Sequence, residues 1–143
     1  MRNILWALLL TPGAAMADEP AAIHVNVETS ALSVSECMAA TGGRSIRDQP
    51  FFKCRVGNTT ASAISAVSYG VTIHEPGRTI QWMPEDEYSR HIWKREIQGG
   101  VEPGEEMEIL MAMRQFPDRA DPSKIEFTMH FTEAFDANGN LIQ

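Results

Sequence analysis

The chain has 143 residues, a formal net charge of −7 and 43% hydrophobic residues. This length suits one domain with a hydrophobic core, and the acidic balance disfavours binding to nucleic acid or to anionic lipid headgroups. Beyond the N-terminal segment, no stretch approaches the roughly eighteen uncharged apolar residues of a membrane-spanning helix, so we expect no membrane span.

Met1–Ala17 has the pattern of a secretory signal peptide. Arg2 precedes the apolar run Ile4–Leu10, and Ala15-Met16-Ala17 forms an Ala-x-Ala cleavage site. Cleavage after Ala17 would leave a single domain, residues 18–143, periplasmic or secreted. Removing Arg2 from the 12 basic residues leaves 11 against 19 acidic ones, a net charge of −8. No cysteine follows the cleavage site closely, so we expect no lipid anchor.

Cys37 and Cys54 are the only two cysteines, and in an oxidising compartment such a pair predicts a structural disulfide. The bridge would enclose Met38–Lys53, whose glycines and proline indicate irregular chain. Closing a loop of this length stabilises a fold by about 3 kcal/mol in the chain-entropy model. A redox-active pair is the alternative, although the spacing is not Cys-x-x-Cys.

Five segments alternate apolar and polar residues with the period of a half-buried strand. In chain order they are Ala22–Glu28, Phe51–Val56, Ala63–His74, Glu105–Met113 and Ser123–Phe135. The residues expected to face the core are Ile23, Val25, Val27, Phe52, Cys54, Val56, Val67, Tyr69, Val71, Ile73, Met107, Ile109, Met111, Met113, Ile125, Phe127, Met129 and Phe131.

Turn residues separate these strands. Gly57–Thr60 and Asp136–Gly139 are rich in glycine and asparagine, and Glu75–Arg78 has Pro-Gly at its centre, which is typical of a type II turn. Ile64 is out of phase with the strand that follows it, so a β-bulge is expected near Ser65-Ala66.

The segment Trp82–Arg95 departs from the strand pattern. Proline followed by three acidic residues resembles a helix start, so we expect one short helix or ordered loop near residues 84–95, with Ile92–Gln98 as a possible further strand. The remaining pattern of strands and turns predicts an all-β fold, an antiparallel sandwich of the immunoglobulin or fibronectin kind.

Turn and strand-edge residues mark four stretches, namely Val56–Thr60, Ala63–Ser65 leading into Tyr69–Val71, Gly99–Glu105 and Asp136–Gly139. In these stretches the chain resembles exported bacterial domains of immunoglobulin-like fold, including the FxLYD-type domains. The aromatic-x-Leu-Tyr-Asp strand of that family is replaced here by Val67–Val71. The resemblance implies a β-sandwich that serves as an accessory or binding module, and it carries no catalytic residue to this chain.

Methionine and histidine in an exported chain raise the possibility of copper binding. Four of the six methionines that follow the leader fall at inward strand positions, where this residue usually fills the core. The residues that remain available for copper are His74, His91, His130 and Met83, but their spacing matches no metal motif. A copper site would use His74, His91 and Met83. We therefore expect no metal and no cofactor, and keep periplasmic copper binding as the alternative function. All four histidines, His24, His74, His91 and His130, are expected on the surface.

No Gly-x-Ser-x-Gly elbow is present, and both cysteines are assigned to a disulfide. The acidic residues at and after the turn near Pro103 are expected to be solvated, and they are Glu102, Glu105, Glu106 and Glu108. The sequence therefore predicts a protein that is not an enzyme.

Trp82, Tyr88 and Trp93 lie among charged residues on an irregular segment, and aromatic side chains of this kind often anchor protein interfaces. The alternative is that the two tryptophans close one end of the sandwich. We expect a non-enzymatic exported immunoglobulin-like binding or accessory module. Its partner is expected to be another periplasmic or envelope protein.

Overall fold

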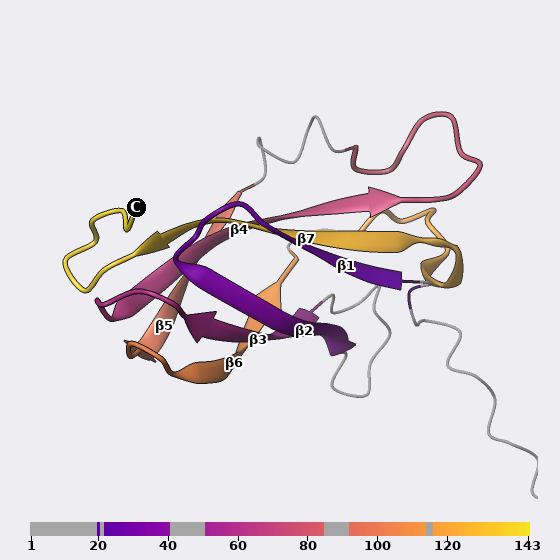
Figure 1. The fold of residues 1–143 in the computed structure, drawn as a ribbon. Coiled ribbons are helices and arrows are strands. Elements are labelled where there is room, and N and C mark those ends of the chain that lie inside the picture. The colour runs from indigo at the N-terminus through magenta and orange to yellow at the C-terminus, as the bar shows by residue number, and fades with distance from the viewer. Residues whose placement is uncertain (1–19, 21, 41–50, 85–91, 114–115) are drawn as a thin grey trace, which may run out of the picture.

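The computed structural model describes residues 20, 22–40, 51–84, 92–113 and 116–143. Seven strands in this part of the chain form two sheets that lie one over the other (Figure 1). The four-stranded sheet has the order β1 (Ala22–Val27), β7 (Glu126–Phe135), β4 (Ile64–His74) and β5 (Trp93–Val101). The three-stranded sheet has the order β2 (Leu32–Ala40), β3 (Phe51–Asn58) and β6 (Glu106–Ala112).

Helical structure in the described residues includes a 3-10 turn at Pro122–Lys124, and none of the helices found there is long and apolar enough to cross a membrane. The all-β prediction is confirmed at the level of two facing sheets. The signal peptide predicted for Met1–Ala17 lies outside the described residues.

Aromatic side chains make contacts between the two sheets. The rings of Phe52 on β3 and Phe127 on β7 meet edge to face, with centroids 4.9 Å apart, and Phe116 lies 6.4 Å from Phe127. The Tyr69 hydroxyl on β4 donates a hydrogen bond to the backbone oxygen of Ala112 at 2.7 Å, which joins β4 to the end of β6. β7 therefore lies over β3, and β4 lies over β6.

The predicted core faces are largely confirmed. Val25 is the exception at 37% exposed, while Ile23, Val27 and Met107 are half-buried. The remaining predicted core residues are buried, and they are Phe52, Cys54, Val56, Val67, Tyr69, Val71, Ile73, Ile109, Met111, Met113, Ile125, Phe127, Met129 and Phe131.

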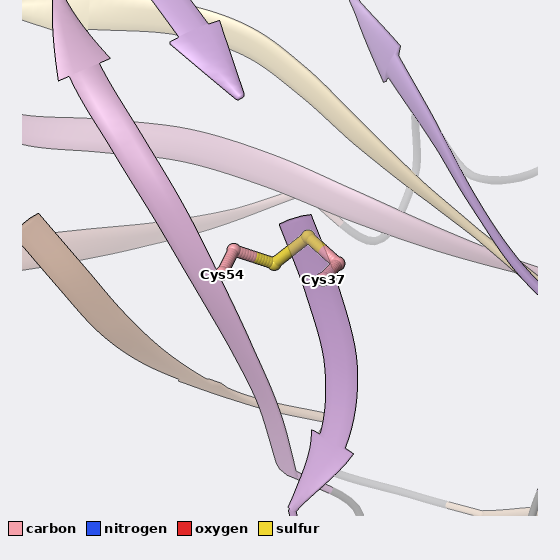
Figure 2. Close-up of a disulfide and its surroundings, with 2 residues drawn as sticks. All are labelled: Cys37 and Cys54. Carbon is pink, nitrogen blue, oxygen red and sulfur yellow. A yellow bond between two sulfur atoms is a disulfide. The ribbon is translucent and has the colours of Figure 1, made fainter. Parts of the chain in front are cut away.

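The predicted disulfide between Cys37 and Cys54 is present, and Figure 2 shows it joining two neighbouring strands. The two cysteines are direct partners in the β2–β3 register, with their Cα atoms 4.1 Å apart. Strand β2 was not predicted. A bulge between Val34 and Glu36 interrupts its alternation, so its apolar residues do not keep a period of two.

One feature of the predicted sandwich is wrong, because the pairing is not wholly antiparallel. β1 pairs with β7 in parallel, Ala22 opposite Glu126 and Val27 opposite Phe131. The chain passes from β1 into β2 of the other sheet rather than into a hairpin. A strand without a hairpin partner in its own sheet is free to pair in either direction.

The turns predicted at Glu75–Arg78 and Asp136–Gly139 are confirmed. The turn predicted at Gly57–Thr60 begins too early, because Gly57 and Asn58 still pair with β2 and belong to β3. Arg78 N donates to Glu75 O at 3.1 Å and Gly77 has a φ of 84°, as a type II turn requires. The β4–β5 register shifts between Ile64 and Ala66, which is the expected bulge. A strand does follow the irregular segment and begins at Trp93; residues 85–91 of the expected helix or loop lie outside the described part.

Truncating the aromatic contact between the sheets should cost much of the fold's stability. Phe52 is fully buried, so Phe52→Ala should lower the free energy of unfolding by about 3–5 kcal/mol. Leu110→Ala is the matched control on the outer face of the same sheet, where the side chain is 52% exposed. Urea unfolding of both variants measures the difference, and equal losses would contradict the assigned core.

The turn after β7 should depend on pH. The backbone hydrogen bond from Asn140 to the Asp136 carboxylate, supported by a second one from Asn138, lowers the pKa of Asp136 below its ordinary value of 3.8. Because the pKa falls on folding, the ionised group stabilises the fold above pH 3.8, and this effect is lost as pH falls through the folded-state pKa.

Asp136→Asn should therefore lower the melting temperature at pH 7, and its difference from wild type should shrink in acid. Thermal melts from neutral pH down to about pH 2.5 follow this change across the relevant range. A difference that stays constant across that range would contradict the role of the carboxylate.

Candidate functional site

The loop Glu75–Met83, which follows β4 (Figure 1), is an irregular segment held by several hydrogen bonds of its own. The backbone closes it, since Ile73 N donates to Met83 O at 3.0 Å and Met83 N donates to Ile73 O at 3.3 Å. Its two ends therefore lie side by side, and the residues between them project beyond the end of the sheet.

The side chain of Gln81 fastens the inside of this loop. Its Oε1 accepts a hydrogen bond from Glu75 N at 2.7 Å, and its Nε2 donates to Glu75 O at 3.2 Å and to Arg78 O at 2.6 Å. Arg78 Nε in turn donates to Ile80 O at 2.8 Å. Compact surface loops that are packed by their own side chains are frequently functional.

Trp82 belongs to the same fastening. Its Nε1 donates to Glu75 Oε2 at 2.6 Å, and the Arg78 guanidinium carbon lies 3.7 Å from the ring centroid. The indole is half-buried and packs against the core. Trp82 therefore packs against the core and also contacts two residues of the loop, Glu75 and Arg78.

Ile80 is the residue that the loop exposes. Its relative exposure of 80% is the highest among the exposed large hydrophobic side chains of the described residues. Single exposed aliphatic side chains are common on protein surfaces. Ile80 is a candidate contact residue because hydrogen bonds within the loop hold its backbone in place. Sequence reasoning missed it, although an isoleucine placed two residues after a type II turn was a signal of an exposed position.

The structure brings the two predicted tryptophans to one edge of the four-stranded sheet. Trp93 is half-buried, lies opposite Tyr69 in the β4–β5 register, and its ring is 5.6 Å from the Tyr69 ring. Trp82 precedes Met83, which forms a β-bridge with Ile73. Ile73 is four residues beyond Tyr69 on β4, a distance of about 13 Å along the strand. Tyr88, the third predicted residue, lies outside the described part.

The outer face of the same sheet carries three of the four histidines. His24 Nε2 and His74 Nδ1 lie 3.8 Å and 3.7 Å from the same atom, Glu126 Oε2, and both rings are more than half exposed. His130 was expected on the surface, but it is only 1% exposed. The reason is local, since Asn26 Nδ2 and Thr72 Oγ1 each lie 3.2 Å from one of its ring nitrogens.

A pocket of about 410 Å³ lies beside this face, and His74, Glu126 and Met83 contribute to its lining. Met83 also packs against the core, and His91 lies outside the described residues. Within the described ranges, no group of three or more His, Cys, Asp or Glu side chains could hold a metal ion. The copper alternative therefore gains no support from the described residues.

No family model, curated protein or solved structure matches the chain. The FxLYD resemblance thus rests on the turn and strand-edge residues alone.

Removing the Gln81 amide should loosen the loop without unfolding the domain. Gln81→Ala deletes three hydrogen bonds. We expect the free energy of opening the loop to fall by about 1.4 kcal/mol, so that trypsin cleaves after Arg78 roughly tenfold faster. Thr79→Ala, an exposed neighbour, is the control. Mass spectrometry of the fragments identifies the cut, and equal rates for Gln81→Ala and wild type would show that this side chain does not hold the loop.

Proposed function

We propose that the protein is a non-enzymatic, exported binding or accessory module of immunoglobulin-like fold that contacts another periplasmic or envelope protein. The observation that carries the proposal is the fastened loop Glu75–Met83, which holds Ile80 at 80% exposure. A preorganised apolar anchor loses little conformational entropy on binding, which is how protein interfaces gain affinity from few residues.

Two further features support the proposal. The described residues form seven strands in facing sheets of four and three, which is the strand count of a constant-type immunoglobulin domain. The Cys37–Cys54 disulfide suits an oxidising compartment, which agrees with a leader cleaved after Ala17. In such domains the loops at the ends of the sandwich are where recognition residues usually lie.

This proposal assigns different roles to the residues of the predicted surface, Trp82, Tyr88 and Trp93. Trp82 supports the contact by holding the loop, because its nitrogen and ring are already occupied by Glu75 and Arg78. Ile80 makes the contact, and the half-buried Trp93 extends the same edge of the sheet.

A photo-crosslinking amino acid at position 80, introduced in the cells that make the protein, tests the contact. We expect one defined covalent adduct from position 80 and none from position 138, an exposed site in the turn at the opposite end of the sheet. Combining Gln81→Ala with the cross-linker at position 80 should weaken the adduct, because the loop loses its fastening. Absence of an adduct at position 80, or identical adducts at both positions, would refute the proposal.

A further inference from the structure

Among the described strands, the two sheets differ by one, and none of these strands lies over β5. β1 lies against β2, β7 lies over β3 through Phe127 and Phe52, and β4 lies over β6 through Tyr69. The next position, beside β6 and opposite β5, is occupied by none of the described strands.

A groove marks this position. A hollow of about 220 Å³ lies between residues 95–98 of β5 and residues 107–110 of β6. Among the described strands, β5 pairs only with β4 and β6 only with β3, so the facing edges of β5 and β6 carry no strand partner. Free backbone groups at a sheet edge are the basis for adding a strand from another chain.

The side chains on the core-facing side of β5 determine which kind of segment could pack over this strand. Trp93 and Arg95 lie opposite Tyr69 and Val67, which are core residues, so both point to the same side as the core. Ile97, two residues further on, packs against the core and is half-buried. The inner side therefore presents an aromatic, a guanidinium and an aliphatic side chain at a spacing of two residues.

Arg95 carries the positive charge that an acidic side chain of a partner would complement. It is exposed, and no ion pair to it is found within the described part of the chain, in contrast to Arg55, which lies 3.9 Å from Glu108. An inward-pointing charge on an edge strand can also serve to repel added strands, and the experiment below separates these two roles.

We propose that the groove binds an extended segment of a partner protein, which pairs with β6 and becomes the fourth strand of the three-stranded sheet. One carboxylate of that segment lies against Arg95, and apolar side chains two residues before and after it cover Trp93 and Ile97. This inference rests on the proposed function, since it specifies the chemistry of a protein partner.

A random twelve-residue peptide library displayed on phage tests the groove without knowledge of the partner. Three selections run in parallel, each with one purified, oxidised protein: wild type, Arg95→Glu or Lys94→Glu. Lys94 is the matched control because it is the adjacent residue of β5 and lies opposite Ser68, away from the core-facing side. Thermal melts first establish that both variants fold.

Wild type and Lys94→Glu should enrich peptides with Asp or Glu between apolar residues at two-residue spacing, and Arg95→Glu should enrich Lys or Arg at that position instead. A selected peptide should bind the Arg95→Glu variant at least about tenfold more weakly than wild type, which is a difference of about 1.4 kcal/mol. It should also slow amide hydrogen exchange in β6.

Failure to enrich any peptide would overturn the groove as a docking site and leave Arg95 as an edge-protecting charge. The proposal would also be overturned if Arg95→Glu enriched peptides with the same acidic consensus as wild type. Amide exchange slowed by the peptide outside β5 and β6 would overturn it as well. This selection uses purified protein and a different surface from the position-80 cross-link, so either experiment can fail while the other succeeds.

Discussion

The packing of Phe52 against Phe127 is the contact on which the arrangement of this molecule depends. Hydrogen bonds between strands build each sheet separately, and burial of apolar side chains holds the two sheets face to face. Because strands alternate with a period of two, the inward position of these two rings also determines which residues of β3 and β7 face solvent. The positions of the loop Glu75–Met83 and of the groove beside β6 depend on this packing between the two sheets.

Asn58 connects the layer to the turn between β5 and β6. Its backbone N donates to Glu105 O and its backbone O accepts from Gly104 N, each at 3.0 Å. Its side-chain nitrogen donates to Val101 O at 2.8 Å, and the residue is only 3% exposed. A buried amide that makes all of these bonds fixes the turn from which β5 and β6 both extend.

Local patterns predicted what local chemistry determines. Strand faces, the pairing of Cys37 with Cys54, and the type II turn after β4 all follow from spacing and residue type within a few positions. Strand β2 was missed because its bulge breaks the alternation, and the parallel direction of β1 depends on contacts with β7, which lies at the other end of the chain.

The site was less accessible to sequence reasoning. His130 occupies an outward strand position and is still buried, since residues from β1 and β4 meet its two ring nitrogens. Trp82 was recognised as important, but its pairing with Glu75 and Arg78 depends on how the loop folds back on itself. That fold also decides that Ile80, and not a tryptophan, is left exposed.

The proposed function depends above all on the rigidity of the loop Glu75–Met83, and hydrogen exchange of its backbone amides measures that rigidity. Glu75 N, Arg78 N and Met83 N all donate hydrogen bonds inside the loop or across its base. We expect these three amides to exchange slowly, with protection approaching that of β4. Exchange at the rates of an unstructured peptide, in protein whose β4 and β7 amides remain protected, would show that the loop is not preorganised.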